Sequence, residues 1–204
     1  MMKLFRSSIF AGIAIGTAGF GFLAAGLQTA YGSLAGAVLF SFGLLTVVGY
    51  KLKLYTGTAG FISRTEVGDL FLILLGNIAG CLCVSLLARV SPLEIQAAAQ
   101  KVLQLRLDTG ALRCGLLAIG CGFIMTTAVN FARKGQYLPL LFGVPLFIVC
   151  GFPHCVADAF YFPCVPFAFI KAHFLSVMGL YICIVLGNLV GCNLYRIVLS
   201  KDQY

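Results

Sequence analysis

One histidine and one aspartate stand inside an otherwise apolar and aromatic segment, residues 151–163, which reads GFPHCVADAFYFP. An imidazole exchanges protons near neutral pH. A charged side chain at the centre of a membrane costs about 3 kcal/mol or more, so such a residue indicates a functional site by default. The other histidine, His173, stands beside Lys171 near an expected membrane surface. His154 is therefore the first candidate for a proton-exchanging group, with Asp158 as a neighbour of undecided role.

A second polar interruption lies in residues 51–60, which read KLKLYTGTAG. Thr56 supplies a hydroxyl that can donate a hydrogen bond to an anion oxygen. Lys51 and Lys53 would form an anion-attracting rim, or equally a pair of lysines that extend to the membrane surface. Helices broken at such sites direct their N-termini and free backbone N–H groups at anions.

These groups together suit the passage of a weak-acid anion. An anion in a dry pore loses its hydration at a cost of several kcal/mol. A protonated His154 would offset that cost, either by pairing with the anion or by giving it a proton so that the neutral acid crosses. Thr56 would bond the same oxygen. The alternative is a structural pair between His154 and Asp158 that only satisfies the helix break.

The composition requires these residues to sit in a membrane protein. Of the 204 residues, 61% are hydrophobic and only 10% are charged, whereas soluble domains carry about a quarter charged residues. The net charge of +8 is spread over short loops, which speaks against nucleic-acid binding. The nine cysteines form no CxxC pair, so neither a zinc site nor a disulfide framework is indicated.

The apolar runs predict an all-α protein with six transmembrane helices, of which the second and fifth are interrupted. The expected helices are 9–27, 34–50, 70–87, 111–131, a broken fifth run from 138 to 163, and 174–199. A polar connecting loop of about 90–110 joins the two halves, and the whole chain, 1–204, forms one transmembrane domain.

An internal repeat relates the two halves. GNIAGCLC at 76–83 and GNLVGCNL at 187–194 stand in the third and the sixth expected helix. Three helices per unit invert the second copy in the membrane, and this is the plan of many transporters. The repeats run over about 7–89 and 111–199, each with its interruption in the middle helix. The glycines of GNxxG indicate close approach of helices.

Lysine and arginine in short loops favour a cytoplasmic position for both termini. The inside would carry Lys3, Arg6, Arg64, Arg133, Lys134, Arg196 and Lys201. The outside would carry Lys171 and four positive residues of the 89–113 connection.

The two interruptions and the two GNxxG copies, in this order, resemble the formate/nitrite transporter family over nearly the whole chain. Residues 54–57, Leu-Tyr-Thr-Gly, resemble that family's Leu-Phe-Thr-Ser loop. Residues 151–158, Gly-Phe-Pro-His-Cys-Val-Ala-Asp, resemble its Gly-Phe-Glu-His-Ser-Ile-Ala-Asn. The resemblance implies an aquaporin-like fold, a homopentamer with one pore per protomer, and no cofactor.

The resemblance also implies roles for individual residues. His154 would be the central pore histidine, and Thr56 would face it. The other expected pore residues are Leu54 and Tyr55 at one constriction, Phe147 and Met125 at the other, and Phe152 and Asp158 in the second break. The family's vestibule lysine would fall on Arg106, with Lys101 as a rival.

Three positions depart from the family's pattern. Pro153 replaces a glutamate, Asp158 replaces an asparagine, and Lys53 stands where an acidic residue is usual. These changes rearrange the charges around the expected pore, so they bear on the substrate more than on the fold.

The sequence thus predicts a channel or transporter, not an enzyme, for small monovalent anions of the formate, nitrite or hydrosulfide type. Its partners would be the anion, protons and lipid of the cell membrane, with no nucleic acid. The alternative is an aquaporin-like facilitator of small neutral solutes, although the Asn-Pro-Ala pair of that class is absent. A membrane thiol or haem redox protein is a third and weaker interpretation.

Overall fold

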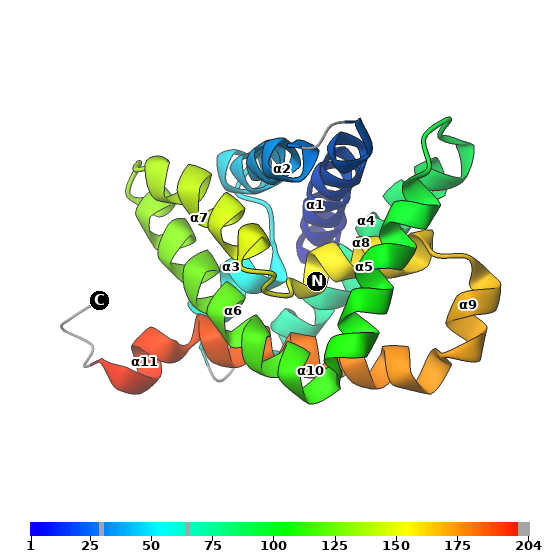
Figure 1. The fold of residues 1–204 in the computed structure, drawn as a ribbon. Coiled ribbons are helices and arrows are strands. Elements are labelled where there is room, and N and C mark those ends of the chain that lie inside the picture. Colours follow the sequence, from blue (N-terminus) through cyan, green and yellow to red (C-terminus); the bar gives the residue numbers. More distant parts are fainter. Residues whose placement is uncertain (29–30, 64–65, 200–204) are drawn as a thin grey trace.

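Helices make up every regular element that the computed structural model describes, in residues 1–28, 31–63 and 66–199 (Figure 1). Arg64 and Lys201, which enter the expected charge pattern, lie outside these residues. The helices are α1 (Met2–Gln28), α2 (Gly32–Gly49), α3 (Tyr55–Ala59), α4 (Val67–Val90), α5 (Ile95–Thr109), α6 (Ala111–Arg133), α7 (Leu138–Val149), α8 (Cys155–Cys164), α9 (Phe167–Ala172), α10 (Phe174–Cys192) and α11 (Leu194–Val198).

Five of these helices, α1, α2, α4, α6 and α10, are long and apolar enough to cross a membrane. The remaining crossing is made in two pieces by α7 and α8, which are shorter apolar helices. The second crossing is interrupted as well, because the short helix α3 follows α2 after a break. The expected all-α arrangement with an interrupted second and fifth helix is confirmed.

The two breaks are built alike. After α2 the backbone turns through the left-handed region at Lys51, with φ of 53°, and after α7 it does so at Gly151, with φ of 68°. Glycine adopts this conformation freely, whereas a lysine does so at a cost. A short extended segment then leads into α3 or α8, which begin at Tyr55 and Cys155. The same backbone reversal therefore places the first residues of both half-helices in the interior.

Small residues bring the helices of each repeat together. A Cβ atom on Gly80 of α4 would lie 2.1 Å from the carbonyl oxygen of Ile9 in α1, and one on Gly191 of α10 would lie 2.0 Å from that of Ile119 in α6. Only glycine fits at such distances. The expected close approach through GNxxG is confirmed for the pairs α1–α4 and α6–α10.

Three expectations about the positions of helices are wrong. The polar connection expected over 90–110 contains helix α5, which buries Ile95, Ala99 and Leu103 on one face. This helix packs beside α8 (Figure 1). The sixth helix, expected to reach residue 199, ends at Cys192 and is followed by α11. The first helix begins at Met2 rather than at residue 9.

Candidate functional site

The two breaks meet at one hydrogen bond between side chains. Thr56 Oγ1 of α3 lies 2.9 Å from Nε2 of His154, which precedes α8, and both residues are buried. His154 Nδ1 accepts a hydrogen bond from the backbone N–H of Ala157 at 3.1 Å and so caps α8. A neutral imidazole with an accepting Nδ1 carries its proton on Nε2. His154 therefore donates to Thr56, whose own hydroxyl proton stays free for a third group.

Apolar side chains surround this pair. The ring of Phe147 lies 5.6 Å from the imidazole of His154 between centroids, and it meets Phe40 of α2 edge-on at 6.2 Å. Leu54, directly before α3, is fully buried. A polar pair inside an apolar wall is the arrangement expected of a narrow, dry passage.

A cavity lies on either side of the pair. The first, here called the lysine-side cavity, has a volume of about 480 Å³, and its lining includes Lys51, Lys53, Gly57, Arg133 and Tyr137. The second, the α5-side cavity, has a volume of about 150 Å³, and its lining includes Phe40, Arg106, Phe147, Phe152, His154 and Asp158.

The two cavities open at different levels along the same helices. Helix α2 contributes Phe40 to the α5-side cavity and Val47 to the lysine-side cavity, about 10 Å further along its axis. Phe147 of helix α7 lines the α5-side cavity, and Tyr137, directly before that helix, lines the lysine-side cavity. The Thr56–His154 pair separates them, because His154 lines one cavity and Gly57, next to Thr56, lines the other.

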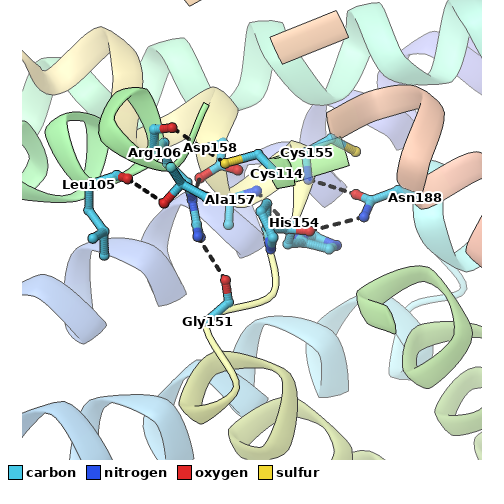
Figure 2. Close-up of polar contacts among 11 residues, drawn as sticks. Leu105, Arg106, Cys114, Gly151, His154, Cys155, Ala157, Asp158 and Asn188 are labelled. Carbon is cyan, nitrogen blue, oxygen red and sulfur yellow. Dashed lines mark hydrogen bonds and ion pairs between the residues drawn. The ribbon is translucent and has the colours of Figure 1, made fainter. Parts of the chain in front are cut away.

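An arginine and an aspartate meet in the α5-side cavity. Figure 2 shows Arg106 of α5 between Asp158 of α8 and the carbonyl of Gly151. Arg106 Nη1 donates to Gly151 O at 2.8 Å, and its Nε lies 3.7 Å from Asp158 Oδ1. Lys101, the rival vestibule residue, is exposed and lines neither cavity in the described part of the chain. Arg106 is thus the basic residue that reaches the site from α5.

The structure does not join Asp158 to His154 by their side chains. Both nitrogens of His154 bond to Thr56 and Ala157, while Asp158 pairs with Arg106. The alternative of a structural His154–Asp158 pair is therefore wrong. Arg106 of α5 takes that place. Its pairing with Asp158 was not predicted, because the 90–110 connection was expected to be a loop.

Two asparagines hold the breaks, and neither was singled out from the sequence. Asn77 of α4 accepts from the N–H of Tyr55 at 2.8 Å and donates to the carbonyls of Ser8 and Lys53. Asn188 of α10 repeats this pattern with Cys155 N, Ala118 O and Pro153 O, as Figure 2 shows in part. The signal was present, since each GNxxG copy holds one asparagine in an apolar helix. Each asparagine bonds to backbone groups of the neighbouring break, before α3 or α8, that would otherwise be unpaired.

Two cysteines of the repeat connect the halves. The thiol of Cys81 in α4 donates to Val156 O in α8 at 3.2 Å, and that of Cys192 in α10 donates to Thr56 O in α3 at 3.3 Å. The GNxxGC helix of each repeat therefore contacts the half-helix of the other repeat. The thiols are free and buried at these positions.

Three other expected site residues form no hydrogen bond with the side chains of the pair in the described part of the chain. The hydroxyl of Tyr55 donates to Val185 O in α10 at 3.3 Å, and Met125 is buried within α6. Neither lines one of the two cavities in the described residues. Lys53 is exposed at the rim of the lysine-side cavity, where its backbone N–H donates to Ser7 Oγ.

Comparisons with known proteins agree with this architecture. The sequence profile described as "Formate/nitrite transporter" matches residues 1–200. The chain is similar to a solved structure titled "Pentameric formate channel with formate bound", with 22% identity, coverage of 96% of this chain and 94% of that one, and a TM-score of 0.78. It is also similar to an "FNT family ion channel", with 19% identity, coverage of 95% and 87%, and a TM-score of 0.80. No curated protein matches the chain.

Proposed function

Because the chain belongs to the formate/nitrite transporter family, a family of membrane transport proteins rather than enzymes, we propose that it passes a small weak-acid anion past His154. The anion is monovalent and of the formate, nitrite or hydrosulfide type. The observation that carries this proposal is the buried Thr56–His154 hydrogen bond between two cavities. A similar solved protein holds formate, which makes formate the first substrate to test.

The site offers groups for an anion at each step of such a passage. Lys51 and Lys53 attract it to the rim of the lysine-side cavity. At the constriction the hydroxyl of Thr56 donates a hydrogen bond to the anion through its free proton. His154 Nε2–H donates to the oxygen of the same hydroxyl. Beyond the constriction, Arg106 is the cation of the α5-side cavity.

His154 is the central group for protonation in this proposal. A protonated imidazole would attract the anion or hand it a proton, so that neutral acid crosses the apolar section. Protonation of Nδ1 requires that the bond from Ala157 N–H open first, because two N–H groups cannot bond to each other. Proton exchange at His154 is thereby coupled to a local change at the start of α8.

The protein as a whole is proposed to be a homopentamer in the cell membrane with both termini in the cytoplasm. The side chain of Ser7 in α1 bonds to the backbone of Lys53, so the start of the chain and the lysine-side cavity share one face. Arg133, near the expected cytoplasmic end of α6, lines the same cavity. In this orientation the lysine-side cavity faces the cytoplasm.

Uptake into liposomes tests the proposed function. Purified protein is reconstituted, and influx of formate, nitrite, hydrosulfide, acetate, lactate and chloride is compared with that of glycerol. We expect one or more of the weak-acid anions to enter faster than into protein-free liposomes. Uptake of glycerol without that of any anion would favour the aquaporin-like alternative instead.

Replacement of the histidine tests its role. We expect His154→Ala to abolish anion uptake or to remove most of its pH dependence, with the oligomer intact by size-exclusion chromatography. His173→Ala is the matched control, because that histidine is exposed between α9 and α10. An unchanged pH profile in His154→Ala would show that the histidine does not carry the protonation step.

A further inference from the structure

No group of the described residues donates a hydrogen bond to the carboxyl group of Asp158. The side chain is fully buried, lines the α5-side cavity, and leaves both of its oxygens without a hydrogen-bond partner. An ionised carboxylate normally accepts hydrogen bonds at both oxygens. The ion pair with Arg106 at 3.7 Å is longer than a hydrogen bond, so it compensates the charge only in part.

His154, which also lines this cavity, has no free nitrogen to take a proton. Its Nδ1 accepts from Ala157, and its Nε2 bonds to Thr56. In the described structure both oxygens of Asp158 are buried at the α5-side cavity without a hydrogen-bond partner, so each is available to take up a proton.

Arg106 is the cation that balances Asp158. Helices α5, α6 and α10 and α8 itself place titratable groups close enough to interact with the carboxyl, and these are Arg106, Cys114, Cys121, Cys155, Tyr161 and Tyr181. Helices α1 and α4 also pack against α8. The cations of α1 are Lys3 and Arg6, which lie at the end of α1 nearest the lysine-side cavity. Arg89 of α4 interacts with Cys164, at the end of α8 opposite to Asp158.

We propose that Asp158 binds the proton that accompanies the anion, and that this proton releases the charge of Arg106 to the anion. With Asp158 ionised, the guanidinium and the carboxylate form a neutral pair, and the cavity has little attraction for an anion. When Asp158 takes up a proton, the carboxylate becomes a carboxylic acid and Arg106 is left without a counter-ion. The anion then occupies that position.

The charges balance in this exchange. The loaded cavity holds one proton and one anion more than the empty cavity, and Arg106 keeps its own proton throughout. Because the two ligands bind to linked sites, the proton strengthens binding of the anion and the anion strengthens binding of the proton by the same factor. The proposal rests on the proposed function, and it adds to His154 a second proton site on the α5 side.

Asp158→Asn tests the coupling, because it keeps the shape of the side chain and removes its charge. Exchange of labelled formate is measured in liposomes with equal pH on both sides, at about pH 6 and about pH 8, on either side of imidazole titration. For the wild type we expect the KM for formate to rise with pH. For Asp158→Asn we expect a KM at the higher pH at least about fivefold below that of the wild type, the lower end of coupling between linked sites.

The matched control is Asp108→Asn, an exposed aspartate at the end of α5 that bonds to Gln104. It should exchange formate as the wild type does. An Asp158→Asn protein that folds and keeps the wild-type KM at both pH values overturns the inference but leaves the proposed function standing. A wild type that exchanges none of the panel's anions contradicts the proposed function, and the inference with it.

A second measurement does not depend on the folding of Asp158→Asn. Formate is added to the detergent-solubilised His154→Gln protein in weakly buffered solution with a pH indicator. Net proton uptake on binding is expected, because Asp158 is intact. Absence of proton uptake in a His154→Gln protein that still binds formate overturns the inference.

Discussion

At the scale of single residues, the proposed chemistry assigns a direct contact with the anion to the hydroxyl of Thr56. It accepts from His154 and keeps its own proton for the anion. Thr56→Val preserves the shape and removes this donor. We expect the rate of formate exchange to fall by about 2- to 10-fold, which corresponds to the loss of one hydrogen bond of roughly 0.5–1.5 kcal/mol. Isotope exchange in liposomes measures it.

Thr56→Ser should retain most of the exchange rate, because the hydroxyl remains. Thr46→Val is the control on α2, where the hydroxyl of a partly exposed threonine donates to the carbonyl of Phe42. Equal rates in Thr56→Val and the wild type would remove the hydroxyl from the proposed path of the anion.

At the scale of elements, the contact between the GNxxG helices and their partners fixes the positions of both breaks. Asn77 and Asn188 hold the broken segments only because their helices lie in backbone contact with α1 and α6. Gly80→Ala and Gly191→Ala would place a methyl group against a carbonyl oxygen. We expect each to lower the free energy of unfolding by about 1–3 kcal/mol, as overpacking does.

Two glycines of the same helices serve as matched controls. A Cβ atom on Gly68 of α4 or Gly179 of α10 would meet nothing within 4 Å. Thermal unfolding of the detergent-solubilised variants should therefore separate Gly80 and Gly191 from Gly68 and Gly179. Similar melting temperatures in all four alanine variants would contradict the role given to helix contact.

The sequence predicted the membrane spans and their breaks but not helix α5 or its contacts. The spans and both breaks followed from apolar length and from glycine, proline and polar residues within it, which are local signals. Helix α5 was missed because its polar face dominates the composition, and its buried face is visible only once α8 is in place. The Arg106–Asp158 pair was missed for the same reason, since it joins residues of two elements far apart in the chain.

At the scale of the whole molecule, much of the described surface is apolar. Large side chains on the outer faces of the long helices are exposed, among them Phe42 of α2, Phe71 of α4 and Phe142 of α7. Lipid covers such a surface in a monomer, and neighbouring protomers cover part of it in the proposed homopentamer. The two cavities also differ in charge, because lysines border one of them while an arginine paired with an aspartate borders the other.

This asymmetry predicts that the lysine side attracts anions through long-range charge. Lys53 is exposed at the rim, whereas Arg133 is committed to the carbonyl of Gly57 and to the ring of Phe61. We expect Lys53→Gln to slow formate exchange by about 2- to 5-fold at low ionic strength, because steering by surface charge raises the rate of encounter. The deficit should shrink in salt of about 1 M, where the screening length is about 3 Å.

Lys171→Gln, an exposed lysine of α9 outside both cavity linings, is the matched control and should exchange formate at the wild-type rate at either ionic strength. A screened charge and a disturbed fold differ in one respect, since salt abolishes only the effect of the first. A Lys53→Gln deficit of the same size at every salt concentration would therefore mean that Lys53 acts through the local structure of the first break and not through its charge.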